Sequence, residues 1–232
     1  MGPIAHPGRT AGPPFRCRAV IFDLDGTLID TVPDIATAVD RALVDVSRPP
    51  IGASLVRSWV GNGAEQLLER AIAHSGAATA GEVSAALALF KKHYADVLTD
   101  RSRLYDGVFE TLRMLADRGR RLAICSNKPS KFVKPLLDHF RVAQYFAMAL
   151  GGDDLPQKKP DPAPLLHIAV RFGIPAADCL MVGDSRNDVE SARGAGMAVV
   201  AVSYGYNYGA DIRDSGPDAV IDSIGELLGL IT

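Results

Sequence analysis

Two carboxylates one residue apart follow an apolar run near the start of the chain. Asp23 and Asp25 lie in the sequence AVIFDLDGTL, which spans residues 19–28. Side chains two positions apart on an extended segment point the same way, so the two carboxylates share a face. An Asp-Gly pair between apolar residues is also typical of a β-hairpin turn. Taken alone, this stretch is compatible with either a reactive site or a turn.

Three more polar clusters follow apolar runs later in the chain, and a hairpin at Asp25 explains none of them. If the runs are parallel strands, their carboxyl ends meet at one edge of the sheet, where open α/β sheets bind ligands. We therefore expect all four clusters to converge in space. The three later clusters are Ser126, Asn127 and Lys128; Lys158 and Lys159; and Gly183, Asp184, Ser185 and Asp188.

Converging carboxylates repel one another, and a divalent cation offsets that repulsion. Asp23, Asp25 and Asp184, with Asp188 nearby, make an all-oxygen set without His or Cys. Such a set suits Mg²⁺ rather than Zn²⁺, and Mg²⁺ held by few carboxylates keeps room for a substrate phosphate. A hydroxyl such as that of Ser126 and a lysine ammonium suit an incoming phosphoryl group. The residue types predict a Mg²⁺ site for a phosphate-bearing substrate.

The elements that must position these residues are short apolar runs that alternate with amphipathic segments. Most runs are apolar at nearly every position, as parallel strands covered on both faces are. The expected fold class is α/β, a doubly wound Rossmann-like parallel sheet. The runs are RAVIFDL, RLAICS, YFAMAL, CLMVG, MAVVAVS and DAVI.

Residues 32–101 interrupt this alternation, because their apolar residues recur at helical spacing and no strand pattern occurs. Thr31 with Asp34 three residues later predicts a capping box at the first of these helices. The expected organisation is a core domain of residues 17–31 and 102–232, with residues 32–101 inserted as a helical cap domain. Residues 1–16, rich in Gly and Pro, are expected to be a flexible leader.

Composition narrows the classes of partner. The 232 residues are 47% hydrophobic with a net charge of −2, which indicates one or two globular domains and no broad basic surface for nucleic acid. No run reaches the roughly 18 apolar residues of a membrane span. Cys17, Cys125 and Cys179 are far apart, which favours a reducing, cytoplasmic compartment. The expected partner is a small-molecule phosphate ester, without nucleic acid or membrane, for a monomer or a homodimer.

The motifs DLDGT, CSNK, KKPDP and GDSRND match, in order, the four motifs of the haloacid dehalogenase superfamily. The resemblance covers the chain from Arg18 onward, and the insertion is similar to that family's first type of cap domain. The similarity extends towards the bacterial phosphoglycolate phosphatases through three segments. These are WVGNGAEQLLERA, GGDDLPQKKPDPAPLL and YGYNYG.

The resemblance implies roles for the three leading carboxylates. Asp23 would be the nucleophile and form an aspartyl-phosphate. Asp25 would protonate the leaving alkoxide and then deprotonate the attacking water. The carboxylates of Asp23 and Asp184, with the main-chain carbonyl of Asp25, would bind Mg²⁺. An acid at position 25 also points to phosphate chemistry, since family members that displace halide carry none there.

The same resemblance implies supporting roles for the residues around the phosphoryl group. Ser126 and the backbone of Asn127 would hold that group. Lys159, directly before Pro160, fits the family's charge-stabilising lysine better than Lys158 does. Asp188 would hold a metal-bound water or orient Lys159.

The cap carries the least specific signals. Gly61, Asn62 and Gly63 precede a predicted helix, where they either present amides to an anion or simply form an N-cap. The aromatic segment 203–209 either lines the mouth of the site or packs on the cap, and packing is the favoured interpretation. For a substrate carboxylate the sequence does not choose among its candidate cations, which are Arg57, Arg70, Lys91 and Lys92.

Together these observations predict a Mg²⁺-dependent phosphomonoesterase that hydrolyses 2-phosphoglycolate to glycolate and phosphate. One alternative keeps the chemistry and changes the substrate to a different small sugar phosphate, or makes the protein a phosphomutase. Another is a non-catalytic binding member of the fold, disfavoured because every reactive group is present.

Overall fold

The computed structural model describes residues 13–232, and its centre is a parallel sheet of 6 strands in the order β5-β4-β1-β6-β7-β8. The expected parallel sheet is confirmed. Going out from β1 the chain first fills one side and later the other, so the switch point lies beside β1, where open sheets bind ligands. The strands are β1 (Ala19–Phe22), β4 (Arg121–Cys125), β5 (Phe146–Leu150), β6 (Cys179–Gly183), β7 (Ala198–Val202) and β8 (Ala219–Ile221).

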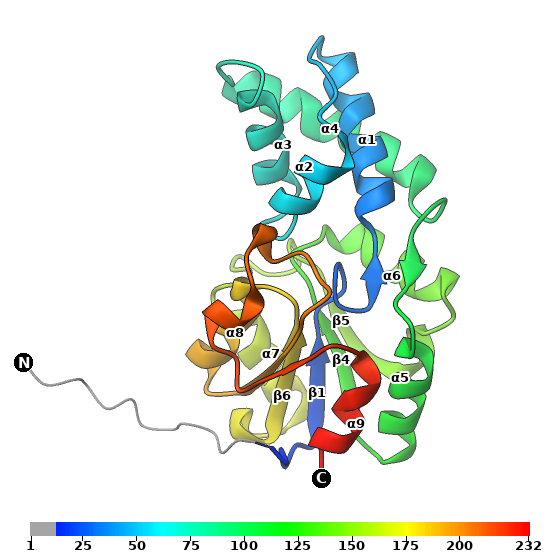
Figure 1. Cartoon of the computed structure of the whole chain (residues 1–232), viewed down its shortest axis with the longest axis vertical. Helices are drawn as coiled ribbons and strands as arrows, with labels where there is room; N and C mark the ends of the chain where they lie inside the picture. The colour runs from blue at the N-terminus through cyan, green and yellow to red at the C-terminus, as the bar shows by residue number, and fades with distance from the viewer. Residues whose placement is uncertain (1–12) are drawn as a thin grey trace, which may run out of the picture.

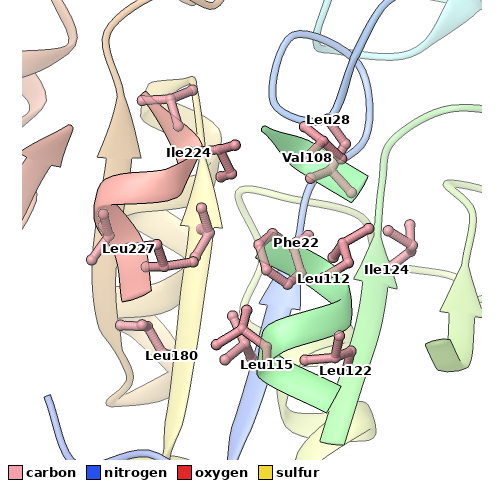
Figure 2. Close-up of a cluster of buried hydrophobic side chains, with 14 of the residues drawn as sticks. Phe22, Leu28, Val108, Leu112, Leu115, Leu122, Ile124, Leu180, Ile224 and Leu227 are labelled. Atoms are coloured by element: carbon pink, nitrogen blue, oxygen red, sulfur yellow. The ribbon is translucent and has the colours of Figure 1, made fainter. Parts of the chain in front are cut away.

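Helices cover both faces of this sheet, as the apolar runs predicted. Val20 and Phe22 of β1 pack with α5 (Val108–Asp117), α6 (Ser130–His139) and α9 (Leu227–Leu230). The intervening residues of β1 pack on the other face with α7 (Ala163–Phe172) and α8 (Arg186–Ala195). Figure 2 shows the first cluster, with Leu112 and Leu115 of α5 against Phe22. Alternate strand residues thus build two separate layers of core.

Consecutive helices from Val32 to Val97, between β1 and β4, form a second body above the carboxyl end of the sheet (Figure 1). They have an apolar cluster of their own that includes Leu43, Leu68 and Tyr94. We call residues 32–97 the helical insertion. Its helices are α1 (Val32–Asp45), α2 (Gly52–Trp59), α3 (Ala64–Ala73) and α4 (Ala80–Val97).

A short antiparallel pair, β2 (Ile29–Asp30) and β3 (Arg103–Leu104), joins the insertion to the sheet. The sequence indicated no strand here, because each strand has only two residues and gives no period-two pattern to detect.

The predicted capping box at α1 is wrong. The hydroxyl of Thr31 donates to Asp25 instead, 2.6 Å away, and makes no side-chain cap. Asp34 is fully buried, and its carboxylate accepts hydrogen bonds from the main-chain N–H groups of Arg101 and Ser102 and from the Ser102 hydroxyl. Hydrogen bonds between the two ends of the insertion therefore take the place of the predicted local cap.

Most of the predicted leader lies outside the described residues. Within it, Phe15 is buried and exchanges main-chain hydrogen bonds with Leu230 and Thr232 near the C-terminus. The cysteines at positions 17, 125 and 179 are free and buried. None of the described helices is both long enough and apolar enough to cross a membrane.

Candidate active site

The four polar clusters meet in one cavity of about 50 Å³ between the carboxyl edge of the sheet and the helical insertion. One water needs roughly 10–15 Å³ by this measure, so the space suits a small ligand. The predicted convergence is therefore observed. The predicted residues that line the cavity are Asp23, Asp25, Gly61, Gly63, Ser126, Asn127, Lys159, Asp184 and Asp188.

Asp23 follows β1 and faces the ammonium of Lys159, which lies 2.9 Å from its Oδ1. The two groups form an ion pair, although the buried Oδ1 atom has no hydrogen-bond partner among the described residues. Burial, with repulsion from Asp188 and Asp25, raises the pKa of Asp23 to about 6, although Lys159 works against the shift. The carboxylate is thus short of positive charge.

Lys159 lies before α7, and Asp188, in the first turn of α8, holds it in place. The distance from Lys159 Nζ to Asp188 Oδ1 is 2.7 Å. Burial lowers the pKa of Lys159, but the nearby carboxylates of Asp188 and Asp23 raise it above its ordinary value overall. The side chain therefore remains an ammonium at the bottom of the cavity.

Asp184 follows β6, and two glycines make room for its carboxylate. Its Oδ1 accepts from the Thr27 hydroxyl at 3.1 Å and its Oδ2 from the N–H of Tyr206 at 2.7 Å. A Cβ on Gly26 would lie 2.3 Å from Asp184 Oδ2, and one on Gly205 would lie 2.1 Å from Asp184 Cβ. Burial, then repulsion from Asp23 and Asp188, raises the pKa of Asp184 well above its ordinary value.

A divalent cation fits this group of carboxylates. Oxygens of Asp23, Asp184 and Asp188 lie within 4.8 Å of one another. Asp188 is already engaged, because Lys159 donates to one of its oxygens and Ser185 and the N–H of Asp184 donate to the other. Asp23 keeps an oxygen without a hydrogen bond. Buried, mutually repelling oxygen donors of this kind are the ligands that Mg²⁺ prefers.

Asp25 faces the same cavity but has different neighbours. Besides the hydroxyl of Thr31, its carboxylate accepts from Lys128 Nζ at 2.9 and 3.1 Å. The same ammonium donates to Tyr94 Oη of α4 at 2.7 Å. The sequence placed Lys128 in a polar cluster and gave it no task. Its pairing with the helical insertion leaves no local signal, since 34 residues separate it from Tyr94.

The loop 61–63 brings the insertion down onto the core. The side-chain amide of Asn127 donates both to the carbonyl of Gly61 and to that of Lys159, each at 2.8 Å. Asn187 of α8 donates to Gly61 and, at 2.9 Å, to Asn62 Oδ1. Lys158 donates to the carbonyl of Asn62 at 3.0 Å. Sequence reasoning assigned no role to Asn187.

Gly63 ends this loop as the N-cap residue of α3 and makes no side-chain cap. Ser126 is buried in the wall of the same cavity, and its Oγ accepts from the N–H of Lys128 at 3.3 Å. Both predicted residues therefore lie at the cavity, Gly63 from the insertion and Ser126 from the end of β4.

The insertion's own wall of the cavity is mostly apolar. The four cations considered for a substrate carboxylate are absent from the cavity lining. Arg57 instead pairs with Asp30 at 3.1 Å and lies over the ring of Tyr206. Tyr206, which was interpreted as packing, does line the cavity, and its hydroxyl also donates to Asp30. The apolar side chains that the insertion contributes to the lining are Ile35, Val60, Ala64, Leu67 and Phe90.

Comparisons with known proteins cover both bodies of the chain. The family model of the haloacid dehalogenase-like hydrolases matches residues 20–202. Phosphoglycolate phosphatase 1 of Pseudomonas aeruginosa is 49% identical over 217 residues, which cover 91% of this chain and 78% of that protein. Phosphoglycolate phosphatase of Nitrosococcus oceani is 44% identical over 215 residues, covering 92% and 96%. The crystal structure of a predicted phosphoglycolate phosphatase from Haemophilus somnus has a TM-score of 0.89 at 40% identity, covering 92% of this chain and 97% of that one.

Proposed function

Because the chain belongs to the haloacid dehalogenase-like hydrolases, we propose that it is a phosphomonoesterase that converts 2-phosphoglycolate into glycolate and phosphate. The observation that carries this proposal is the pair of carboxylates in the cavity, with Asp23 beside Lys159 and Asp25 beside Lys128. Two carboxylates in different surroundings suit different tasks in one reaction. The names of the relatives support the choice of substrate.

In the proposed first step, a carboxylate oxygen of Asp23 attacks phosphorus. A bond forms between that oxygen and phosphorus as the bond from phosphorus to the ester oxygen breaks, which leaves an aspartyl-phosphate and an alkoxide. Lys159, together with the Ser126 hydroxyl, stabilises the charge on the phosphoryl oxygens. Asp188 acts as a positioning residue, because it holds the Lys159 ammonium 2.7 Å from its own carboxylate.

Asp25 supplies the proton that the first step requires. Its protonated carboxyl gives a proton to the departing alkoxide, which leaves as glycolate. The resulting carboxylate takes a proton from water while that water attacks phosphorus. The bond between phosphorus and Asp23 then breaks, and phosphate and the original Asp23 carboxylate are released. Thr31, whose hydroxyl lies 2.6 Å from Asp25 Oδ1, holds this side chain in place.

Asp23 and Asp184, with the main-chain carbonyl of Asp25, are the residues that would hold Mg²⁺. When bound, Mg²⁺ neutralises charge on the phosphoryl oxygens. Two observations support this assignment. Oδ1 of Asp23 has no hydrogen-bond partner among the described residues, and burial, with repulsion between the carboxylates, raises the pKa values of Asp23 and Asp184.

Residues 32–101 are proposed to act as the cap domain over a core of residues 17–31 and 102–232. The cap would exclude bulk water and restrict the size of the substrate. A cavity of about 50 Å³ favours a two-carbon ester over a hexose phosphate. Three free, buried cysteines support a reducing compartment such as the cytoplasm.

Phosphate release from a panel of small esters tests the proposal, with Mg²⁺ and with chelator. The panel holds 2-phosphoglycolate, 3-phosphoglycerate, glucose 6-phosphate and p-nitrophenyl phosphate. We expect 2-phosphoglycolate to lead in kcat/KM by about 100-fold or more and chelator to abolish turnover. Similar kcat/KM values for all four esters would contradict the proposed substrate but not the proposed phosphatase chemistry. No turnover of any ester with Mg²⁺ would contradict the chemistry as well.

A further inference from the structure

We propose that Lys128 and Tyr94 together bind the carboxylate of the substrate's leaving group and so make the enzyme selective for esters that carry a second anion. This inference rests on the proposed function and deepens it. It assigns the part of the cavity that receives the organic half of the substrate.

Lys128 is the cation in the cavity to which the proposed reaction steps give no role. Among the described residues, Lys128 and Lys159 are the positively charged side chains that line the cavity. Lys159 is already shared between Asp23 and Asp188. The side chain of Lys128 is 2% exposed, so an anion that reaches it meets an ammonium largely removed from water. Such charge-assisted hydrogen bonds are among the strongest in proteins.

Tyr94 offers an unused donor at the same place. Its oxygen accepts the hydrogen bond from Lys128, while its own proton has no acceptor among the described residues. Burial, then the charges of Asp25 and Asp34, raises the pKa of Tyr94 well above its ordinary value, so the hydroxyl stays protonated. The ring is fixed by stacking on Phe90 at 5.3 Å and by edge contact with Phe132 at 4.8 Å between centroids. A buried, fixed donor lining a cavity favours an acceptor as its ligand.

The position of Lys128 matches the leaving group. Its ammonium contacts Asp25, the residue proposed to protonate the leaving oxygen. In 2-phosphoglycolate the carboxylate is one carbon away from that oxygen, so it would arrive close to Lys128. The surrounding lining of Ile35, Leu67 and Phe90 is apolar and offers a carboxylate no other charge. Desolvating a carboxylate there would be unfavourable without the Lys128 ammonium.

Matched pairs of ligands, with and without the carboxylate, test this assignment. The substrates are 2-phosphoglycolate and 2-hydroxyethyl phosphate, and the non-hydrolysable ligands are 3-phosphonopropionate and propylphosphonate. Lys128→Met keeps most of the length of the unbranched side chain and removes its charge. Tyr94→Phe removes one hydroxyl and is the milder change. Lys92→Met, at an exposed position on the same helix as Tyr94, is the control.

For Lys128→Met we expect the kcat/KM ratio of the substrate pair to fall by roughly 10–100-fold, and for Tyr94→Phe by about 5-fold. The ratio of dissociation constants for the phosphonates should fall in parallel, and Lys92→Met should change neither ratio. Ratios cancel any general effect on the fold or on Asp25.

The kinetic measurements on the substrates and the binding measurements on the phosphonates together separate this inference from the proposed function. An unchanged ratio in folded Lys128→Met and Tyr94→Phe would overturn the inference while the phosphatase activity stands. If the wild type does not hydrolyse 2-phosphoglycolate, the proposed substrate is wrong, and binding of the phosphonate pair still tests the carboxylate site. Equal affinity of the wild type for the two phosphonates would also overturn the inference.

Discussion

The side-chain amide of Asn127 donates a hydrogen bond to the carbonyl oxygen of Gly61, 2.8 Å away, although 66 residues separate the two in sequence. The same amide donates to the carbonyl of Lys159. One side chain therefore connects the end of β4, the loop that carries Lys159 and the loop of the helical insertion that closes the cavity. The arrangement couples docking of the insertion to the position of the ammonium that faces Asp23.

Replacing the proposed nucleophile, Asp23, should stop turnover without unfolding the protein. We expect Asp23→Asn to lower kcat by roughly 10⁴-fold or more, because the amide cannot form the aspartyl-phosphate. Loss of one charge from a repelling carboxylate group should leave the metal-free protein at least as stable as the wild type. Steady-state kinetics and thermal unfolding check the two effects, with deamidation excluded by mass spectrometry. Near-normal activity would show that another residue is the nucleophile.

Stability of the metal-free protein should depend on pH in a direction unusual for an acidic residue. The pKa of Asp23 is raised from its ordinary value of 3.8 to about 6 in the folded state, so the folded protein binds the proton more tightly. The free energy of unfolding should therefore fall as pH rises from about 4 to about 6, by an amount on the order of 1–3 kcal/mol. Unfolding in chelator across this range measures the slope.

The pKa of Asp184 is also raised in the folded state, so this residue makes the pH dependence of stability steeper. In Asp23→Asn the slope should become shallower, while Mg²⁺ should stabilise the wild type more at about pH 7.5 than at about pH 5. A wild-type stability that rises steadily over the window would contradict the assigned charge repulsion.

The docking of the insertion depends on Asn187. Its amide donates to Gly61, to Asn62 and to the hydroxyl of Tyr208. We expect Asn187→Ala to lower kcat/KM by about 10-fold and to cost about 1 kcal/mol of stability, since each of three acceptors loses one hydrogen bond. Limited proteolysis at the connections 31–33 and 100–105 should speed up. Glu190→Ala, exposed on the same helix, is the control and should behave as the wild type does.

The space around Asp184 can be tested without removing a functional group. A Cβ on Gly205 would lie 2.1 Å from Asp184 Cβ, whereas one on Gly229 would meet nothing within 4 Å. Gly205→Ala should displace the carboxylate, lower kcat by about 100-fold and cost roughly 1–3 kcal/mol. Gly229→Ala should leave the activity unchanged. Mg²⁺ titration of both variants reports whether metal affinity falls with activity, as we expect for Gly205→Ala alone.

The placement of the main site was predictable because it follows from topology. Once the apolar runs are recognised as parallel strands, the residues after each run must lie at the same edge of the sheet. The convergence of Asp23, Ser126 and Asp184 could therefore be predicted from the sequence. The strand order was not needed for that step. The positions of the two-residue strands β2 and β3 were not predictable, because two residues carry no period.

The contacts of individual side chains were harder to anticipate than the site itself. Asp34 fits a local capping pattern, yet its carboxylate accepts hydrogen bonds from the N–H groups of Arg101 and Ser102, which are 67 and 68 residues away in sequence. Lys128 was known only as a member of a polar cluster, because its partner Tyr94 lies on a helix whose docking no local pattern specifies. Pairings of this kind depend on how two bodies meet.

The chain enters and leaves the helical insertion through adjacent positions, since Asp30 of β2 pairs with Arg103 of β3. A segment with neighbouring ends can be exchanged for another of different length without changing the spacing of the strands on either side. The residues proposed to break the phosphate ester belong to the core, whereas Tyr94 and most of the apolar lining belong to the insertion. If the proposed roles hold, bond cleavage belongs to the core, and substrate choice is shared between Lys128 of the core and the side chains of the insertion. New specificities can then evolve, or be engineered by grafting, through replacement of the insertion while the core is kept.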